Sequence, residues 1–302
     1  GTEANILILS NFADDIILIS AIEHPSIINF QQYNNNTQLI RVGKEGVVDL
    51  GALRELLQQS KDKKMLVSVM AANNETGIMQ PLQQIRELTM QYKAYLHSDA
   101  TQIIGKIAFN LQELDLDFMT ISAHKFHGPP GCGALIHKKS PHLLPHIIGG
   151  GQESGLRSGT ENIAAIAGMA KAAEITVAND NMPSDLRDYM EAELRRICPD
   201  IVIFGHNVER LPNTSYLAMP AVDCKVQIMN FDLESIAVST GSACSSGRIS
   251  TSHVLKAMEV DDNIANCAIR VSLDQTTTKT EIDKFIAVWQ DIYKRLTNNE
   301  KG

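Results

Sequence analysis

The chain has 302 residues, 44% of them hydrophobic and 21% charged, which is typical of a soluble globular protein large enough for about two domains. Its formal net charge is −8, and no lysine- or arginine-rich stripe is present, which argues against nucleic acid or an anionic membrane as the main partner. No apolar run approaches the roughly 20 residues of a spanning helix, so a cytoplasmic location, or an organellar matrix, is expected.

In its first part, the chain predicts strands over 16–20, 39–42, 65–70, 94–97, 117–121 and 132–136, with helices over 27–32, 53–58 and 81–92. Polar residues follow the strand ends. Alternating strands and helices of this kind indicate an α/β fold with a mostly parallel sheet that is covered on both faces.

A polar stretch that contains Pro183 indicates a domain boundary near residue 178, giving domains 1–178 and 179–302. Helices are predicted over 162–173, 186–197, 225–230, 252–258 and 279–296, and strands over 201–204, 214–219, 236–239 and 268–273. The helices and strands after residue 178 therefore predict a small α+β domain.

Five polar residues fall just after predicted strands: His24, Asn74, Asp99, Gln102 and Lys125. Ligands of parallel sheets bind beyond the carboxyl ends of the strands, so these side chains are expected to converge on one crevice. Each also has a structural interpretation. His24 suits a helix start, Asn74 a turn, and Asp99 an N-cap.

The stretch Ser122–Gly131 places Lys125 between two histidines and between two strands. An amine held there is well placed to form a Schiff base with an aldehyde cofactor, although a surface lysine on a loop fits the same pattern. The glycine-rich run 149–160 precedes a helix, with Thr160 as its cap. It suits either a phosphate loop or a flexible connection.

The cysteines are odd in number and widely spaced, without a Cys-x-x-Cys pair, so neither a disulfide framework nor a thiolate metal site is expected. Cys244 differs from the other four because all of its neighbours are small, as in Thr240–Gly247. A thiol on such a segment is expected to be exposed and reactive, whereas Cys132, Cys198, Cys224 and Cys267 are expected to be inert core thiols.

Four motifs occur together and in order: Asp99 in His-Ser-Asp-Ala-Thr-Gln, Lys125 in Ser-Ala-His-Lys, Arg-Ser-Gly-Thr at 157–160, and Gly-Ser-Ala-Cys at 241–244. Together they resemble the pyridoxal-phosphate-dependent cysteine desulfurases of the NifS/IscS-like group, in the class V aminotransferase superfamily. The resemblance covers essentially the whole chain. It implies the fold type I architecture, with a large domain on a sheet of the seven-stranded type and a small C-terminal domain.

The resemblance also implies roles for single residues. Lys125 would bind pyridoxal phosphate as a Schiff base and shuttle a proton, Asp99 would pair with the ring nitrogen, and Gln102 would bond the phenolic oxygen. His24 would stack on the ring, and Asn74 would lie near the ring and the substrate carboxylate. The phosphate would be bound by Thr2, Ser122 and His124, with Thr160 from a second subunit. Arg270 would clamp the substrate carboxylate, and Cys244 would accept sulfur from L-cysteine as a persulfide.

The resemblance thus implies a homodimer that converts L-cysteine to L-alanine and hands sulfur to an acceptor or scaffold protein for iron–sulfur cluster assembly or tRNA thiolation. Relatives begin several tens of residues earlier, so the chain is expected to be N-terminally incomplete. The usual Ser-Leu-Gly-Arg-Phe-Thr is replaced by Ser272–Thr277. Two alternatives stay open: another pyridoxal-phosphate enzyme, such as a selenocysteine lyase or an aminotransferase, and an inactive member with a binding or scaffold role.

Overall fold

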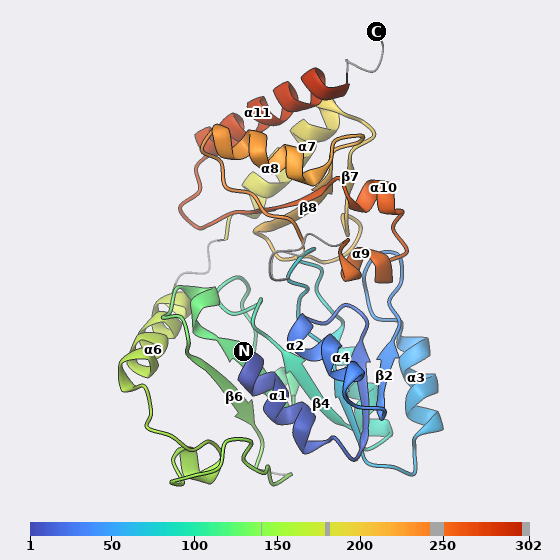
Figure 1. Cartoon of the computed structure of the whole chain (residues 1–302), viewed down its shortest axis with the longest axis vertical. Helices are drawn as coiled ribbons and strands as arrows, with labels where there is room; N and C mark the ends of the chain where they lie inside the picture. Colours follow the sequence, from blue (N-terminus) through green and yellow to red (C-terminus); the bar gives the residue numbers. More distant parts are fainter. Residues whose placement is uncertain (140, 179–181, 242–250, 298–302) are drawn as a thin grey trace. The chain divides into compact units, whose positions relative to one another are not determined.

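The computed structural model describes residues 1–139, 141–178, 182–241 and 251–297 (Figure 1). Two compact units are present. The first comprises Gly1–Gly43, Val47–Asn73 and Gln80–Asp180, and the second comprises Lys44–Gly46, Asn74–Met79 and Asn181–Gly302. The single boundary near residue 178 stays a prediction. In addition, the two short early segments Lys44–Gly46 and Asn74–Met79 make their contacts within the second unit.

Within the described residues, the first unit is built on a six-stranded sheet in the order β2-β1-β3-β4-β5-β6. Its strands are β1 (Ile16–Ser20), β2 (Thr37–Ile40), β3 (Met65–Ser68), β4 (Tyr95–Asp99), β5 (Phe118–Ser122) and β6 (Gly133–His137). All neighbours pair in parallel except β6, which is antiparallel to β5. The predicted mostly parallel sheet is confirmed.

Helices accompany this sheet: α1 (Thr2–Asn11), α2 (Pro25–Ile28), α3 (Leu50–Gln59), α4 (Leu82–Gln91), α5 (Leu111–Leu114) and α6 (Ile163–Ala178), with 3-10 turns η1 (Asn29–Gln32), η2 (Ala123–Phe126) and η3 (Glu153–Gly155). The side chain of Asp49 accepts a hydrogen bond from the Ala52 amide at 3.0 Å and caps α3. This helix therefore begins at Leu50, three residues before the predicted start at Leu53.

The core of the first unit explains why both faces of its sheet are apolar. Ile17 and Ile19 of β1 pack in one cluster with Ile8 of α1 and Ile27 of α2. Successive side chains of a strand point to opposite faces, so Leu18 lies on the other side, where it is also fully buried. Both faces of β1 are thus covered, as predicted.

The second unit contains an antiparallel sheet of β7 (Val202–Ile203), β8 (Thr214–Ala218) and β9 (Ala268–Ser272). Its helices are α7 (Ser184–Ile197), α8 (Cys224–Leu233), α9 (His253–Ala257), α10 (Asp262–Ala265) and α11 (Lys279–Thr297). Trp289 of α11 is fully buried in the core, and Phe285 stacks on Phe231 of α8 at 4.9 Å between ring centroids.

One strand predicted for this unit is absent. The segment 236–239 makes a single bridge between Ser239 and Arg270 and is not a strand. Its apolar side chains Ile236 and Val238 pack against the core instead. A strand needs a hydrogen-bonded partner along its length, and here the pairing ends after one residue. The β-branched residues of 236–239 therefore did not suffice to predict a strand.

None of the helices in the described part of the chain is both long and apolar enough to cross a membrane.

Candidate functional site

Lys125 is held by a turn that is anchored by two buried residues. The turn η2 follows β5 directly, and Ala123 and Phe126 are fully or almost fully buried, whereas Lys125 is exposed. The Ala123 amide donates to the Cys132 carbonyl at 3.0 Å, and the Gly128 amide donates to the Ala123 carbonyl at 2.9 Å. The amine is therefore presented to solvent from a backbone that is fixed on both sides.

Helix α6 packs against this turn. Ala172 forms a buried cluster with Ala123 and Phe126, and Met169 packs on the same cluster. A Cβ atom on Gly168 would lie 2.6 Å from Cγ of Pro129, so only glycine permits this close approach. The small residues of α6 thus give the lysine-bearing turn a rigid backing.

Asp99 ends β4, next to β5, and the residue is 7% exposed. One oxygen accepts a hydrogen bond from Asn5 Nδ2 at 2.8 Å, and the other accepts from the Thr101 amide at 2.9 Å. The sequence placed Asp99 just after its strand as an N-cap candidate. It is instead the last strand residue, and its carboxylate is shared between a local turn and α1.

His24 is connected to Asp99 through a chain of hydrogen bonds. Asn5 Nδ2 also donates to Ser26 Oγ at 2.9 Å, and Ser26 Oγ lies 2.8 Å from Nδ1 of His24. Since the Ser26 amide donates to the same Nδ1 at 3.2 Å, this nitrogen acts as an acceptor, and the ring proton lies on Nε2. His24 also caps α2, which confirms its structural interpretation, whereas its place against the ring stays a prediction.

Ser122, His124 and the start of α1 lie together. Ser122 Oγ is 3.0 Å from Nδ1 of His124. A Cβ atom on Gly1 would lie 3.8 Å from both Ser122 Oγ and Thr101 Oγ1. Burial, followed by the nearby charge of Lys125, lowers the pKa of His124. The exposed side chain of Thr2 belongs to the first turn of this helix.

Two residues here were not singled out from the sequence, namely Asn5 and Thr101. Thr101 Oγ1 is buried and has no hydrogen-bond partner among the described residues. A buried hydroxyl without a partner costs free energy, so it points to a polar ligand beside Ser122. Asn5 lies on the face of α1 that also buries Ile8 and Leu9, so its role follows from the packing of this helix.

The remaining candidates of the first unit behave differently. Gln102 accepts a hydrogen bond from Lys106 Nζ at 2.8 Å. Thr160 is exposed and does not cap α6, because the Asn162 side chain accepts from the Ala165 amide at 3.2 Å. The predicted cap at Thr160 is therefore wrong. The preceding Arg157 is paired with Glu3 of α1 at 2.9 Å.

Asn74 and Arg270 form a separate pair in the second unit. Arg270 Nη1 donates to the Asn74 carbonyl at 2.7 Å. Arg270 Nε and Asn74 Oδ1 are both buried without a hydrogen-bond partner among the described residues, so a donor and an acceptor are left unused. Cys244 lies outside the described residues.

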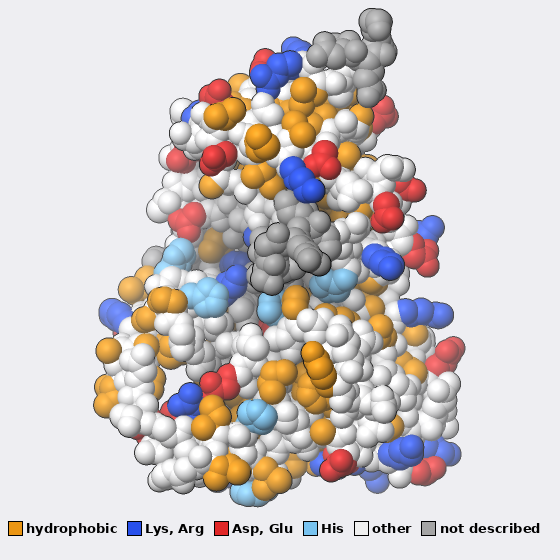
Figure 2. Space-filling view, viewed as in Figure 1, with side chains coloured by type: hydrophobic (Ala, Val, Ile, Leu, Met, Phe, Trp, Pro, Cys, Tyr) orange, Lys and Arg blue, Asp and Glu red, His pale blue; other side chains and the backbone are white. Residues whose placement is uncertain are grey.

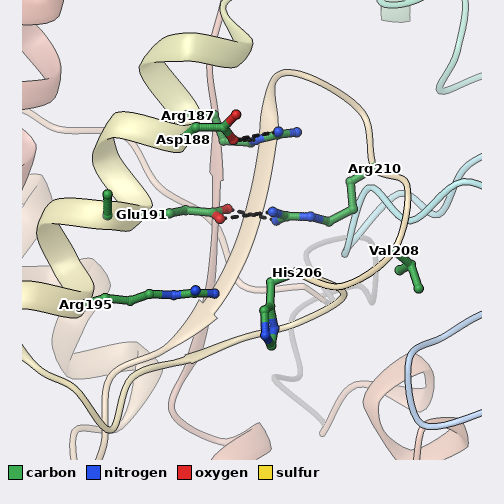
Figure 3. Close-up of a pocket in the computed structure, with 8 residues that line it drawn as sticks. Arg187, Asp188, Glu191, Arg195, His206, Val208 and Arg210 are labelled. Atoms are coloured by element: carbon green, nitrogen blue, oxygen red, sulfur yellow. Dashed lines mark hydrogen bonds and ion pairs between the residues drawn. The ribbon is translucent and has the colours of Figure 1, made fainter.

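Two further polar groups lie apart from these candidates. In the second unit, a cavity of about 450 Å³ is lined by Arg187, Asp188, Glu191, Ala192, Arg195, His206, Val208 and Arg210 (Figure 3). Glu191 is paired there with Arg210 at 2.8 Å, with both side chains below 10% exposure. None of the residues predicted from the sequence lines this cavity.

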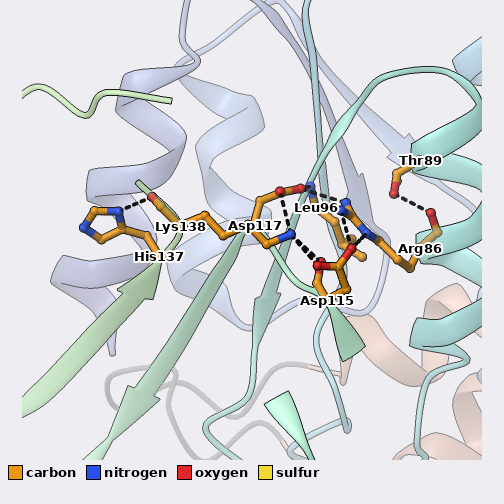
Figure 4. Close-up of polar contacts among 7 residues, drawn as sticks. All are labelled: Arg86, Thr89, Leu96, Asp115, Asp117, His137 and Lys138. Atoms are coloured by element: carbon orange, nitrogen blue, oxygen red, sulfur yellow. Dashed lines mark hydrogen bonds and ion pairs between the residues drawn. The ribbon is translucent and has the colours of Figure 1, made fainter. Parts of the chain in front are cut away.

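In the first unit, Arg86 and Lys138 surround Asp115 and Asp117 (Figure 4). Asp117 also accepts from the Leu96 amide at 2.9 Å. These ion pairs join α4 to the residues that precede β5 and follow β6, at the end of β5 opposite to Lys125. They stabilise the sheet, and they lie away from the end of β5 that carries Lys125.

Comparison with known proteins gives the class of this site. The aminotransferase class V family model matches residues 1–285. The cysteine desulfurase IscS of Dictyoglomus turgidum is 35% identical, over 98% of this chain and 78% of that relative. The cysteine desulfurase of Cereibacter sphaeroides is 38% identical, over 93% of this chain and 73% of that relative.

Solved structures agree. A NifS-like protein from Rickettsia africae superimposes with a TM-score of 0.90 at 42% identity, covering 97% of this chain and 79% of that one. A second NifS-like protein gives a TM-score of 0.88 at 34% identity, covering 98% and 81%. The chain belongs to the class V aminotransferase family and, within it, to the cysteine desulfurases.

This family depends on pyridoxal phosphate, and the residues of the first unit fit that cofactor. Lys125 offers an exposed amine, and Asp99 a carboxylate that is already held by two donors. Ser122, His124 and the unpartnered hydroxyl of Thr101 gather polar groups at the start of α1, where anions are favoured.

Proposed function

We propose that the protein is a cysteine desulfurase that converts L-cysteine to L-alanine and takes up the sulfur on Cys244 as a persulfide. The observation that carries this proposal is the exposed amine of Lys125 on the turn after β5, together with the donor-bound carboxylate of Asp99 at the end of the neighbouring strand β4. In the reaction, a C–S bond is replaced by a C–H bond, while an S–S bond forms between the substrate sulfur and the Cys244 thiol.

When bound, pyridoxal phosphate supplies an electron sink for the charge that develops at the substrate. Lys125 would hold the cofactor covalently, and Asp99 would neutralise and orient its ring nitrogen. Ser122, His124 and Thr101 would bind the phosphate with the first turn of α1, to which Thr2 belongs. Gln102 and His24 would face the phenolic oxygen and the ring.

The residues of this chain would divide the remaining work. Lys125 would move a proton at the substrate carbon once its amine is released, because the turn fixes its backbone and leaves its side chain free. Arg270 would bind the substrate carboxylate, for which a guanidinium offers two parallel donors, and Asn74 would lie beside it. Thr160 would act from a second copy of the chain.

A homodimer is supported by exposed apolar side chains of the first unit. Leu144, Ile148, Ile163, Ile166 and Ile175 are between 44% and 85% exposed. Figure 2 shows hydrophobic side chains at the surface over α6. Contiguous exposed apolar surface is typical of protein interfaces.

The persulfide on Cys244 would pass to a sulfur acceptor or scaffold protein for iron–sulfur cluster assembly or tRNA thiolation.

The test is turnover of L-cysteine by the purified chain with added pyridoxal phosphate. The parent is expected to retain cofactor absorbance after gel filtration and to release alanine and, with a thiol reductant, sulfide. Lys125→Ala should lose the retained absorbance and lower alanine formation roughly a hundredfold or more. Cys244→Ala should keep the absorbance but lose sulfide release.

Cys267→Ala is the matched control for the cysteine variant. The Cys267 thiol donates to the Asn263 carbonyl at 3.1 Å, and burial raises its pKa, so it is a poor nucleophile. This control should release sulfide at the parental rate. Sulfide release by Cys244→Ala at that rate would refute the persulfide step, and transamination without desulfuration would favour an aminotransferase.

A further inference from the structure

The cavity of about 450 Å³ in the second unit has a strongly charged lining. Helix α7 contributes a charged residue at every fourth position, namely Arg187, Glu191 and Arg195, and residues four apart lie on the same side of a helix. His206 and Arg210 face this side of α7 (Figure 3). Apart from an alanine and a valine, every residue that lines the cavity is ionisable. Pockets for apolar ligands are lined mainly by hydrophobic and aromatic side chains, so this cavity suits a small polar ligand.

A closed ion pair forms the most buried part of this lining. Arg210 donates from Nη1 and Nη2 to the two carboxylate oxygens of Glu191, at 2.8 Å and 2.9 Å. Ser215 Oγ donates to the same carboxylate at 2.7 Å. Both charged side chains are less than 10% exposed. The charges of Glu191 and Arg210 therefore compensate each other, and this pair adds no net charge to the cavity.

The charge of Arg187 is also compensated. Its Nε and Nη2 donate to Asp188 at 2.9 Å and 2.6 Å, and its Nη1 donates to the Leu211 carbonyl at 2.6 Å. These three hydrogen bonds fix a side chain that is 12% exposed. Arg187 therefore gives the cavity a rigid wall whose positive charge is matched by the neighbouring carboxylate.

Arg195 differs from the other two arginines of the cavity. Its side chain is exposed, and among the described residues it has no hydrogen-bond or ion-pair partner. Figure 3 shows it extending from α7 toward His206. Nδ1 of His206 lies 3.0 Å from the Ile203 carbonyl, which can only accept, so Nδ1 donates and Nε2 is the ring nitrogen that a ligand can reach. The lining thus carries one uncompensated positive charge, that of Arg195.

We propose that this cavity binds a small oxyanion of the phosphate or polycarboxylate class, with Arg195 and His206 as its main contacts. A guanidinium offers parallel donors that match two oxygens of one phosphate or carboxylate group. The chain as a whole has a net charge of −8, so it repels anions in general, and binding depends on a local site of this kind. The inference goes beyond the desulfurase proposal, because it uses none of the residues assigned to that reaction.

The test is calorimetric titration of the cofactor-loaded chain with sodium pyrophosphate and, separately, with sodium citrate, at constant ionic strength. The parent should bind one of these anions saturably, and the tighter one identifies the class of ligand. Arg195→Gln should raise the Kd about tenfold or more, because it removes charge-assisted hydrogen bonds. Arg195→Lys, which keeps the charge but loses the parallel donors, should give an intermediate Kd, and His206→Gln should raise it about threefold.

The neighbouring arginine provides a matched control. Arg196 is 76% exposed, pairs with Glu193 at 2.9 Å and does not line the cavity. Arg196→Gln removes the same charge one residue away and should leave the Kd within about twofold of the parent. Titrations in which neither anion saturates the parent, or an equal loss in Arg196→Gln and Arg195→Gln, would overturn the inference. If the parent retains no cofactor or forms no alanine, the desulfurase proposal fails, yet the comparison of these two variants still decides whether the cavity binds the anion.

Discussion

Asn5 connects three parts of the first unit through one side-chain amide. Its Nδ2 donates to Asp99 at 2.8 Å and to Ser26 at 2.9 Å, and Ser26 contacts His24. The carboxylate that we assign to the ring nitrogen is therefore held by a residue of α1. Short sequence motifs singled out Asp99, Ser122, His124 and Lys125 as candidates. They could not identify Asn5 or Thr101, whose roles depend on how α1 packs at the ends of β4 and β5.

Replacing Asn5 tests this arrangement. Asn5→Ala removes one of the two donors to the Asp99 carboxylate, and a hydrogen bond to a charged group is worth about 1.5–3 kcal/mol. We expect weaker cofactor binding, by about tenfold or more, in a titration followed by cofactor absorbance. Asn11→Ala is the control, because this side chain also lies on α1 but bonds the Leu7 carbonyl. Equal affinities of Asn5→Ala and the parent would contradict the assignment.

At the scale of elements, His97 ties the central strands together. It is fully buried in β4, with Nδ1 2.8 Å from Ser68 Oγ of β3 and Nε2 3.0 Å from Thr120 Oγ1 of β5. Short apolar, β-branched runs predicted these strands, because strands that are buried on both faces are apolar along their whole length. It could not predict polar links inside the sheet, nor helix α1, whose consecutive Ile6–Leu9 run carries no helical period.

The buried imidazole makes stability depend on pH. Burial lowers the pKa of His97 to about 4, against the opposing charge of Asp99. Below the unfolded value near 6.5, the unfolded chain binds a proton that the folded chain does not bind, so stability is lost as pH falls from about 6.5 to about 4. The loss from this residue should reach about 3 kcal/mol.

Urea unfolding across this pH range measures the effect. His97→Gln should be less stable than the parent at neutral pH but should show a smaller loss on acidification, whereas His137→Gln, on the exposed end of β6, should follow the parent. Identical pH dependence in His97→Gln and the parent would show that His97 does not titrate in this way.

At the scale of the whole molecule, the proposed dimer depends on α6. One side of this helix backs the lysine turn through Ala172, while Ile163 and Ile166 remain 73% and 44% exposed. The sequence predicted a helix over 162–173. It could not indicate which side stays uncovered, because that depends on how Gly168 approaches Pro129.

A charge on the exposed side of α6 tests the dimer. The parent should sediment as a dimer, and Ile166→Asp should shift it toward the monomer, because burying an unpaired carboxylate in an apolar interface costs several kcal/mol. If Thr160 acts across the interface, cofactor retention should fall with dimer content. Ile264→Asp, at a 38% exposed position in the second unit, should remain dimeric. A monomeric parent would reject the proposal.

The early turn at 74–79 has a consequence for how the protein is made. Glu75 meets Ser252 across 177 residues, and Asn74 meets Arg270 across 196. During synthesis this turn emerges long before its partners, so the second unit cannot be finished until the last part of the chain has left the ribosome. A fragment that begins at residue 181 would lack both side chains. Both contacts can therefore form only after nearly the whole chain has been synthesised.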